Sequence, residues 1–183
     1  MVNIEVKQGS VVDEDVDAII CSANNWLILG SGVAGEIKLH GGPSIQHECD
    51  LIIQNNGGHP VAIGTAHCTG AGEFLYSKKH LKHIIHAVGM GYKTRKENDL
   101  FDRILATPES VFQAITNTLA IANNMGVHTI AIPLMCARPG YSVVEAEDVP
   151  KVMLDATVNA INAYAERENS IKQVMICTGS FSL

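Results

Sequence analysis

The chain has 183 residues, of which 46% are hydrophobic and 17% are charged, and these values predict one globular domain with a large core. Its formal net charge of −6 at pH 7 argues against broad binding to nucleic-acid backbones, which requires clustered positive charge. The sequence contains no signal-peptide pattern at Met1 and no uninterrupted apolar run of 18 residues, so we expect a cytoplasmic protein with no membrane partner.

The cysteine and histidine patterns give no metal-site signal. Five cysteines lie far apart in the sequence without a CxxC pair, which predicts reduced thiols, no disulfide framework and no zinc site. His80, His83 and His86 recur at every third residue, but on a strand positions 83 and 86 point to opposite faces. We therefore expect no metal and no cofactor.

Strands and helices are expected to alternate along the chain. The expected strands cover 3–7, 18–21, 62–69, 82–88, 128–133 and 173–177. The expected helices begin at Val33 and cover 44–54, 109–125 and 145–164, and Thr107 followed by Pro108 marks the start of the third. Residues 89–102 are expected to form a long polar loop, which either caps a binding site or lies on the solvated surface. This alternation predicts an α/β fold, a three-layer α/β/α sandwich with a central mixed sheet.

The stretch 17–42 carries the main functional signal. A buried apolar strand ends close to Asn24 and Asn25, at the edge where an open α/β sheet presents groups to a ligand. Gly30-Ser31-Gly32 follows, and its two glycines let backbone N–H groups approach a bound group closely. A helix then begins, and a helix N-terminus favours an anion. The stretch therefore predicts a site for a phosphate-bearing ligand.

The glycine spacing is a weak signal by itself, since it lacks the Lys-Ser/Thr of a Walker A loop. The whole string, however, resembles the macro domain family. Three segments carry that resemblance, Cys21-Ser22-Ala23-Asn24, Gly30-Ser31-Gly32-Val33 and Gly41-Gly42-Pro43, and it continues through 64–66, 69–72, 84–89 and 130–133. The resemblance covers nearly the full chain and implies a single macro domain over residues 1–183.

The resemblance also implies a cleft for ADP-ribose or a related nucleotide, free or attached to a protein partner. Asn24 would hydrogen-bond the distal ribose, although a role as a turn residue at the strand end remains the alternative. The segments 30–33 and 136–141 would hold the ribose and the diphosphate. The candidate ligand-binding residues are Ser10, Val11, Asn24, Gly30, Ser31, Gly32, Val33, Cys136, Ala137, Arg138, Pro139, Gly140 and Tyr141.

Four positions depart from the family pattern. Ser10 stands where the family has an Asp that accepts a hydrogen bond from the adenine amino group, and a neutral hydroxyl is a weaker acceptor than a carboxylate. In the diphosphate loop, Pro139 removes one N–H group, whereas Arg138 adds a cation that can pair with phosphate. Ala34 occupies the place of the usual catalytic Asp, so a hydrolase here would rely on Asn24 and the phosphates of the substrate.

Three functions remain open on this basis. The first is a binding module for ADP-ribose, a related metabolite or an ADP-ribosylated protein, and we rank it first because the glycine loop is present and the usual carboxylate is not. The second is a weak hydrolase of ADP-ribosyl esters or O-acetyl-ADP-ribose. The third is a macro domain with lost or altered ligand specificity. Glu36 and His40 are expected on the helix surface and at the helix end, and Cys136 is expected to be a small packing residue without a basic partner.

Overall fold

A computed structural model of the chain describes residues 2–95, 102–167 and 169–180. Its centre is a seven-stranded sheet with the order β1-β7-β6-β2-β4-β3, in which β5 pairs with β4. The strands are β1 (Asn3–Lys7), β2 (Ala18–Asn24), β3 (Ala66–Gly70), β4 (His83–Tyr92), β5 (Arg103–Ile104), β6 (Thr129–Pro133) and β7 (Gln173–Cys177). The neighbours from β1 to β4 pair in parallel, whereas β3 and β5 pair with β4 in antiparallel fashion. The predicted mixed sheet is confirmed.

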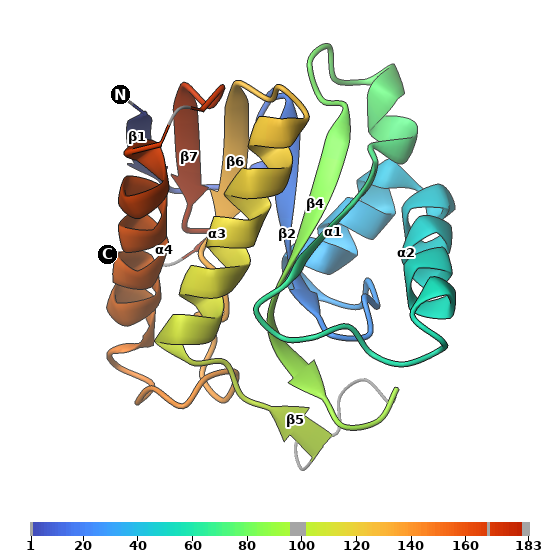
Figure 1. The fold of residues 1–183 in the computed structure, drawn as a ribbon, viewed down its shortest axis with the longest axis vertical. Coiled ribbons are helices and arrows are strands. Elements are labelled where there is room, and N and C mark those ends of the chain that lie inside the picture. Colours follow the sequence, from blue (N-terminus) through green and yellow to red (C-terminus); the bar gives the residue numbers. More distant parts are fainter. Residues whose placement is uncertain (1, 96–101, 168, 181–183) are drawn as a thin grey trace.

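Helices cover both faces of the sheet, as the three-layer prediction requires (Figure 1). The four α-helices among the described residues are α1 (Gly32–Gly41), α2 (Pro43–Asn55), α3 (Pro108–Asn124) and α4 (Val149–Ala165). Successive residues of β2 point to opposite faces. Ile20 therefore packs into the core beneath α3 and α4, and Ile19 packs into the core beneath α1 and α2. Two short 3-10 turns, η1 (Val11–Asp13) and η2 (Gly72–Tyr76), complete the described elements.

Several element boundaries differ from those expected. The third strand begins at Ala66 instead of residue 62, because Gly64 lies before it in a left-handed conformation (φ +91°). The last helix begins at Val149, four residues later than expected, with a proline in its first turn. β4 continues to Tyr92, so residues 89–92 of the expected loop belong to the sheet, and residues 96–101 of that loop lie outside the described part of the chain.

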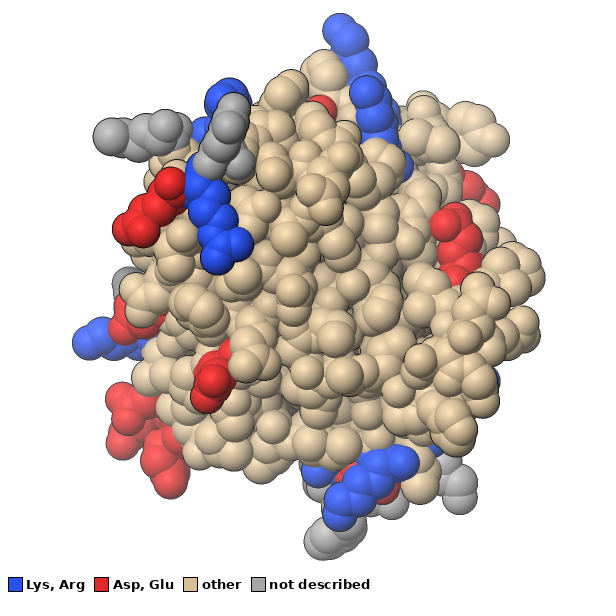
Figure 2. Space-filling model, viewed as in Figure 1, with Lys and Arg blue, Asp and Glu red and all other residues tan. Residues whose placement is uncertain are grey.

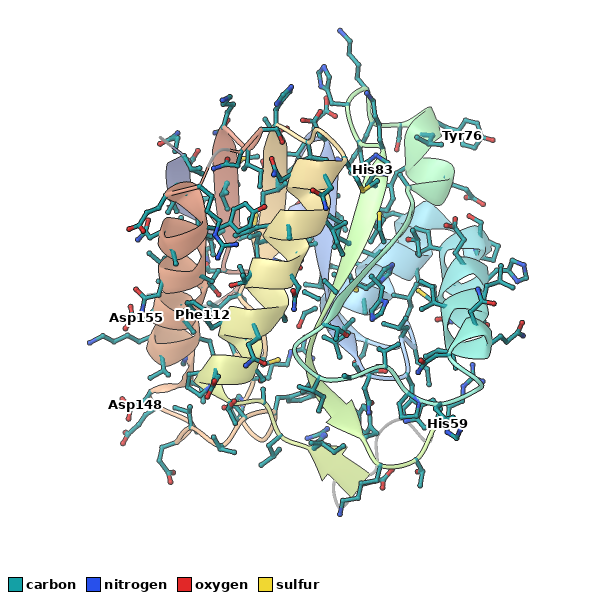
Figure 3. All side chains as sticks on the ribbon, viewed as in Figure 1. His59, Tyr76, His83, Phe112, Asp148 and Asp155 are labelled. Carbon is teal, nitrogen blue, oxygen red and sulfur yellow. The ribbon has the colours of Figure 1, made fainter. Side chains whose placement is uncertain are left out.

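The histidines lie apart, as the strand pattern predicted. His86 is fully buried in β4 and its Nε2 lies 3.0 Å from the Thr69 hydroxyl. His80 pairs with Asp15, and His83 stands at the start of β4 (Figure 3). Within residues 2–95, 102–167 and 169–180, no group of three potential ligands is placed to hold a metal ion.

The surface that carries α3 and α4 has few charges near its centre, and most Lys, Arg, Asp and Glu side chains in that view lie toward its edges (Figure 2). None of the described helices is both long and apolar enough to cross a membrane.

Candidate functional site: a cleft at the strand ends

A cavity of about 650 Å³ opens where the parallel strands end. The residues that follow β1, the last residues of β2 and β4, and the residues that end or follow β6 and β7 all contribute to its walls. Ligands of open α/β sheets bind at this edge because the strand-to-helix loops converge there. The volume lies within the range of small-molecule sites. The cavity is therefore the candidate binding site.

The glycine loop and the first turn of α1 form one wall. Gly32 has φ +60°, a left-handed conformation that disfavours any side chain, and it begins the helix. Ser31 is the N-cap residue, but its side chain makes no capping hydrogen bond, and the first turn has no acidic residue. The first-turn N–H groups of α1 are thus left for a ligand, as an anion site requires.

Asn24 lines the cavity, but its side chain also shapes the loop after β2. Its Oδ1 accepts hydrogen bonds from the backbone N–H groups of Trp26 (3.0 Å) and Ile28 (3.3 Å), and its Nδ2 donates to the Ile28 carbonyl (3.1 Å). Asn24 therefore holds the turn after β2, and its second Nδ2 hydrogen is left to donate to a ligand, so the structure is compatible with both the turn role and the ligand role.

Asn25 has a structural role. Its side chain donates to the Tyr92 carbonyl (3.1 Å) and accepts from the Tyr92 N–H (2.8 Å), so it ties the end of β2 to the end of β4. It is 4% exposed and lies outside the cavity wall. These two bonds explain why β4 extends beyond the expected end at Val88.

Arg138 points into the cleft from the loop after β6. Its Nη2 lies 3.3 Å from the position that a Cβ atom on Gly32 would occupy, so the guanidinium lies directly over the glycine loop. Arg138 is exposed and forms no ion pair with any residue in the described ranges. A planar, permanently charged donor at a helix N-terminus is suited to a phosphate group.

Cys136, in the loop after β6, packs beside Gly89 of β4, at a point where the pairing between β2 and β4 changes register. The β2–β4 pairing shifts after Ala23, and Gly89 is left between the paired residues. A Cβ on Gly89 would lie 2.9 Å from the Cys136 Sγ, so the thiol occupies the space beside this glycine. Burial raises the pKa of the Cys136 thiol to about 12, with a smaller opposing effect from a hydrogen bond with Ser22. The thiol is therefore protonated near neutral pH, and it packs beside Gly89 at the cavity wall.

Arg103, which lies outside the cavity wall, fixes the end of the loop after β6. The Arg103 guanidinium stacks on the Tyr141 ring at 4.1 Å and donates to the Gly140 carbonyl (3.1 Å). Tyr141 lines the cavity, whereas Pro139 and Gly140 do not. The missing N–H of Pro139 is therefore not at the cavity wall.

Glu36 lies at the cavity, contrary to the expectation of a surface position unrelated to the site. It is exposed, but its carboxylate accepts a hydrogen bond from the Ser10 hydroxyl, with Oγ and Oε2 2.5 Å apart. The same hydroxyl accepts from the Val12 N–H at 3.4 Å and so caps η1. Ser10 and Glu36 are therefore in direct contact, although 26 positions separate them in the sequence.

Most of the predicted ligand-binding residues line the cavity together. They are Ser10, Val11, Asn24, Ser31, Gly32, Val33, Cys136, Ala137, Arg138 and Tyr141, whereas Gly30, Pro139 and Gly140 lie outside the wall. Gly30 instead packs its carbonyl against Gly35, where a Cβ would lie 2.9 Å away. Ala34 lines the cavity as a buried side chain that carries no polar group.

The wall residues that the sequence did not predict include Glu36, Met90 and Tyr92 at the end of β4, and residues 177–180, which end and follow β7. Residues 177–180 could have been predicted, because the carboxyl ends of parallel strands meet at one edge of the sheet, where the ligand binds. Glu36 had only the weaker signal of lying four residues after Gly32, on the same face of the helix.

Comparisons with known proteins agree with this geometry. The family model described as "Macro domain" matches residues 20–153. A macro domain-containing protein of Caldanaerobacter subterraneus subsp. tengcongensis is 39% identical over 172 residues, which cover 93% of this chain and 85% of that protein.

Two solved structures share the fold. The Oceanobacillus iheyensis macrodomain with ADP has a TM-score of 0.70 at 20% identity, with 96% of this chain and 83% of that one covered. The Trypanosoma brucei macrodomain in complex with ADP-ribose has a TM-score of 0.67 at 18% identity, with 96% and 63% covered. The sequence motifs, the sheet order and the family match lead to one conclusion: this chain belongs to the macro domain family.

Proposed function

We propose that this protein binds ADP-ribose or a related ADP-ribose-containing nucleotide, either free or attached to a protein. The observation that carries the proposal is the position of the Arg138 guanidinium over Gly32, at the first turn of α1. The cation, the helix dipole and the free N–H groups all favour a ligand with a diphosphate at this place. Complexes of two family members with ADP and ADP-ribose support the same class of ligand.

We place binding ahead of hydrolysis because the cavity offers few groups for catalysis. Ala34 supplies no carboxylate, and the described residues of the wall include no histidine. The Cys136 thiol is protonated near neutral pH because burial raises its pKa. A hydrolase would have to use Asn24 and the phosphates of its substrate, and most of the Asn24 hydrogen-bonding capacity is occupied by its own loop.

The test is an NMR titration of the 15N-labelled protein with ADP-ribose, and with adenosine as the ligand that lacks the diphosphate. We expect ADP-ribose to shift the amide signals of Ser31, Gly32 and Ala137, with adenosine shifting them much less. The signal of Asp155, on the outer side of α4 (Figure 3), should not move. No shift in the cleft at millimolar ADP-ribose would contradict the proposal.

Incubation with an ADP-ribosylated protein tests the second candidate function. We expect the modification to remain attached. Release of ADP-ribose at a rate above that of the buffer alone would favour the hydrolase instead.

A further inference from the structure

The cavity wall carries two charged side chains of opposite sign among its described residues, Glu36 and Arg138. Arg138 lies over Gly32, and Glu36 follows Gly32 by four residues on the same helix. Four residues of α-helix correspond to one turn and a rise of about 6 Å. The cavity is therefore electrostatically polarised along the first turns of α1.

The Ser10 hydroxyl holds the Glu36 carboxylate in place. Its hydrogen is donated to Glu36 Oε2, and its oxygen accepts the N–H of Val12. Its only hydrogen is therefore committed to Glu36, and the one lone pair that remains on its oxygen is a weaker, neutral acceptor than a carboxylate. The acceptor at this end of the cleft is Glu36, whose Oε1 has no hydrogen-bond partner within residues 2–95, 102–167 and 169–180.

A carboxylate accepts hydrogen bonds and repels phosphate. A nucleotide in this cleft would therefore direct its diphosphate toward Arg138 and a neutral, donor-bearing part toward Glu36. In an adenine nucleotide the neutral donors are the exocyclic 6-amino group of the base and the ribose hydroxyl groups. Of these, only a contact between Glu36 and the 6-amino group can distinguish adenine from a base that lacks this group. A hydrogen bond to a charged acceptor is stronger than one to a neutral hydroxyl, so this contact would contribute to discrimination.

We propose that Glu36 is the base-selecting residue of this cleft, that it accepts a hydrogen bond from an exocyclic amino group, and that Ser10 positions its carboxylate. The proposal rests on the proposed nucleotide-binding function and adds a basis for selecting the nucleotide. Ser10 thus acts through Glu36 and is a positioning residue. Glu36 of α1 would thus supply the carboxylate for adenine selection that Ser10, after β1, does not have.

The test compares two ligands by calorimetry, ADP and the 5′-diphosphate of purine riboside, which differs from ADP only in lacking the 6-amino group. We expect the wild-type protein to bind ADP roughly tenfold more tightly than the analogue, because the analogue cannot donate to Glu36. In Glu36→Gln the ratio should fall to about threefold or less, since a neutral amide oxygen is a weaker acceptor. Affinity for the analogue should not fall in that variant.

Asp155→Asn is the matched control, because it also removes one negative charge but lies on the outer side of α4 (Figure 3). It should keep the wild-type ratio. Ser10→Ala should give an intermediate ratio without a matching loss of affinity for the analogue, which a general loss of folding would produce.

The outcomes separate the two proposals. Equal wild-type affinity for ADP and the analogue would overturn the role of Glu36 and leave nucleotide binding intact. An unchanged ratio in Glu36→Gln would have the same meaning. If the wild-type protein binds ADP-ribose in the same calorimeter but binds neither of these two ligands, this inference alone is overturned. If it does not bind ADP-ribose either, the proposed function is overturned, and this inference with it.

Discussion

Arg138 and Gly32 lie against each other across the mouth of the cleft, and the arginine Nη2 is 3.3 Å from the place of a Gly32 Cβ. The contact joins two loops that are separated by more than 100 residues in the sequence. The absence of a side chain at Gly32 lets the guanidinium approach the helix N-terminus, so the glycine and the arginine together form the proposed anion site.

Gly32→Ala should therefore lower both stability and ligand affinity. A left-handed φ costs about 1–2 kcal/mol for a residue with a Cβ, and the new methyl group would also displace Arg138. Gly126→Ala is the matched control, since Gly126 has φ +69° but no atom within 4 Å of an added Cβ. Urea unfolding should show similar losses for both variants, whereas calorimetry should show weaker ADP-ribose binding only for Gly32→Ala. Equal affinity of the two variants would contradict the role of this contact.

Asn24 and Asn25 are adjacent, but their replacement should have different effects. Asn25→Ala removes two bonds to the backbone of Tyr92 and leaves buried groups unpaired, at a cost on the order of 2–3 kcal/mol in the free energy of unfolding. Asn24→Ala removes three bonds that are only partly buried, so water can replace them and we expect a smaller loss of stability. It should weaken ADP-ribose binding roughly tenfold, because Asn24 lines the cavity and fixes the loop beside it. Urea unfolding and calorimetry on both variants measure the two effects. Wild-type affinity in Asn24→Ala would leave Asn24 with the turn role alone.

His86 should make the protein less stable in mild acid. Burial lowers the pKa of His86 to about 3, from an ordinary value near 6.5, with a smaller contribution from His67. The unfolded chain therefore binds a proton below pH 6.5 that the folded protein binds only near pH 3. The free energy of unfolding should consequently fall, as the pH falls through this window, by about 1.4 kcal/mol per pH unit from this group.

An NMR titration of the His86 ring checks this prediction directly. Its signals should not titrate between pH 7 and 5, because burial holds the pKa of His86 well below this range. A His86 midpoint near 6.5 would contradict the account.

Much of the fold was accessible from the sequence because its signals were local. The alternation of Ile4 and Val6 and the capping pair Thr107-Pro108 each marked an element that the structure confirms. The extension of β4 was not accessible, since it depends on the Asn25 side chain bonding the Tyr92 backbone 67 positions away. The short strand β5 was also missed, because two residues are too few to show a period.

In the candidate site too, the features with a local sequence motif were predicted, and those that depend on contacts between distant residues were not. The glycine loop and the segment 136–141 were found from their motifs, and most of their residues line one cavity. Glu36 was not found, because the Ser10 hydroxyl that donates to its carboxylate approaches it from another element. The direction of Arg138 likewise follows from the packing of two loops and not from its neighbours in the sequence.

We propose that the nucleotide's diphosphate binds in the cleft through Arg138. Calorimetric titration of ADP-ribose into the wild-type protein, Arg138→Gln and Lys151→Gln tests this contact. Lys151 lies exposed near the start of α4, so its replacement removes the same charge outside the cleft.

We predict that Arg138→Gln binds ADP-ribose roughly tenfold more weakly than the wild-type protein, because a charge-assisted contact to the diphosphate is lost, and that Lys151→Gln binds like the wild type. Undetectable binding by the wild-type protein, or equal losses in both variants, would contradict the account.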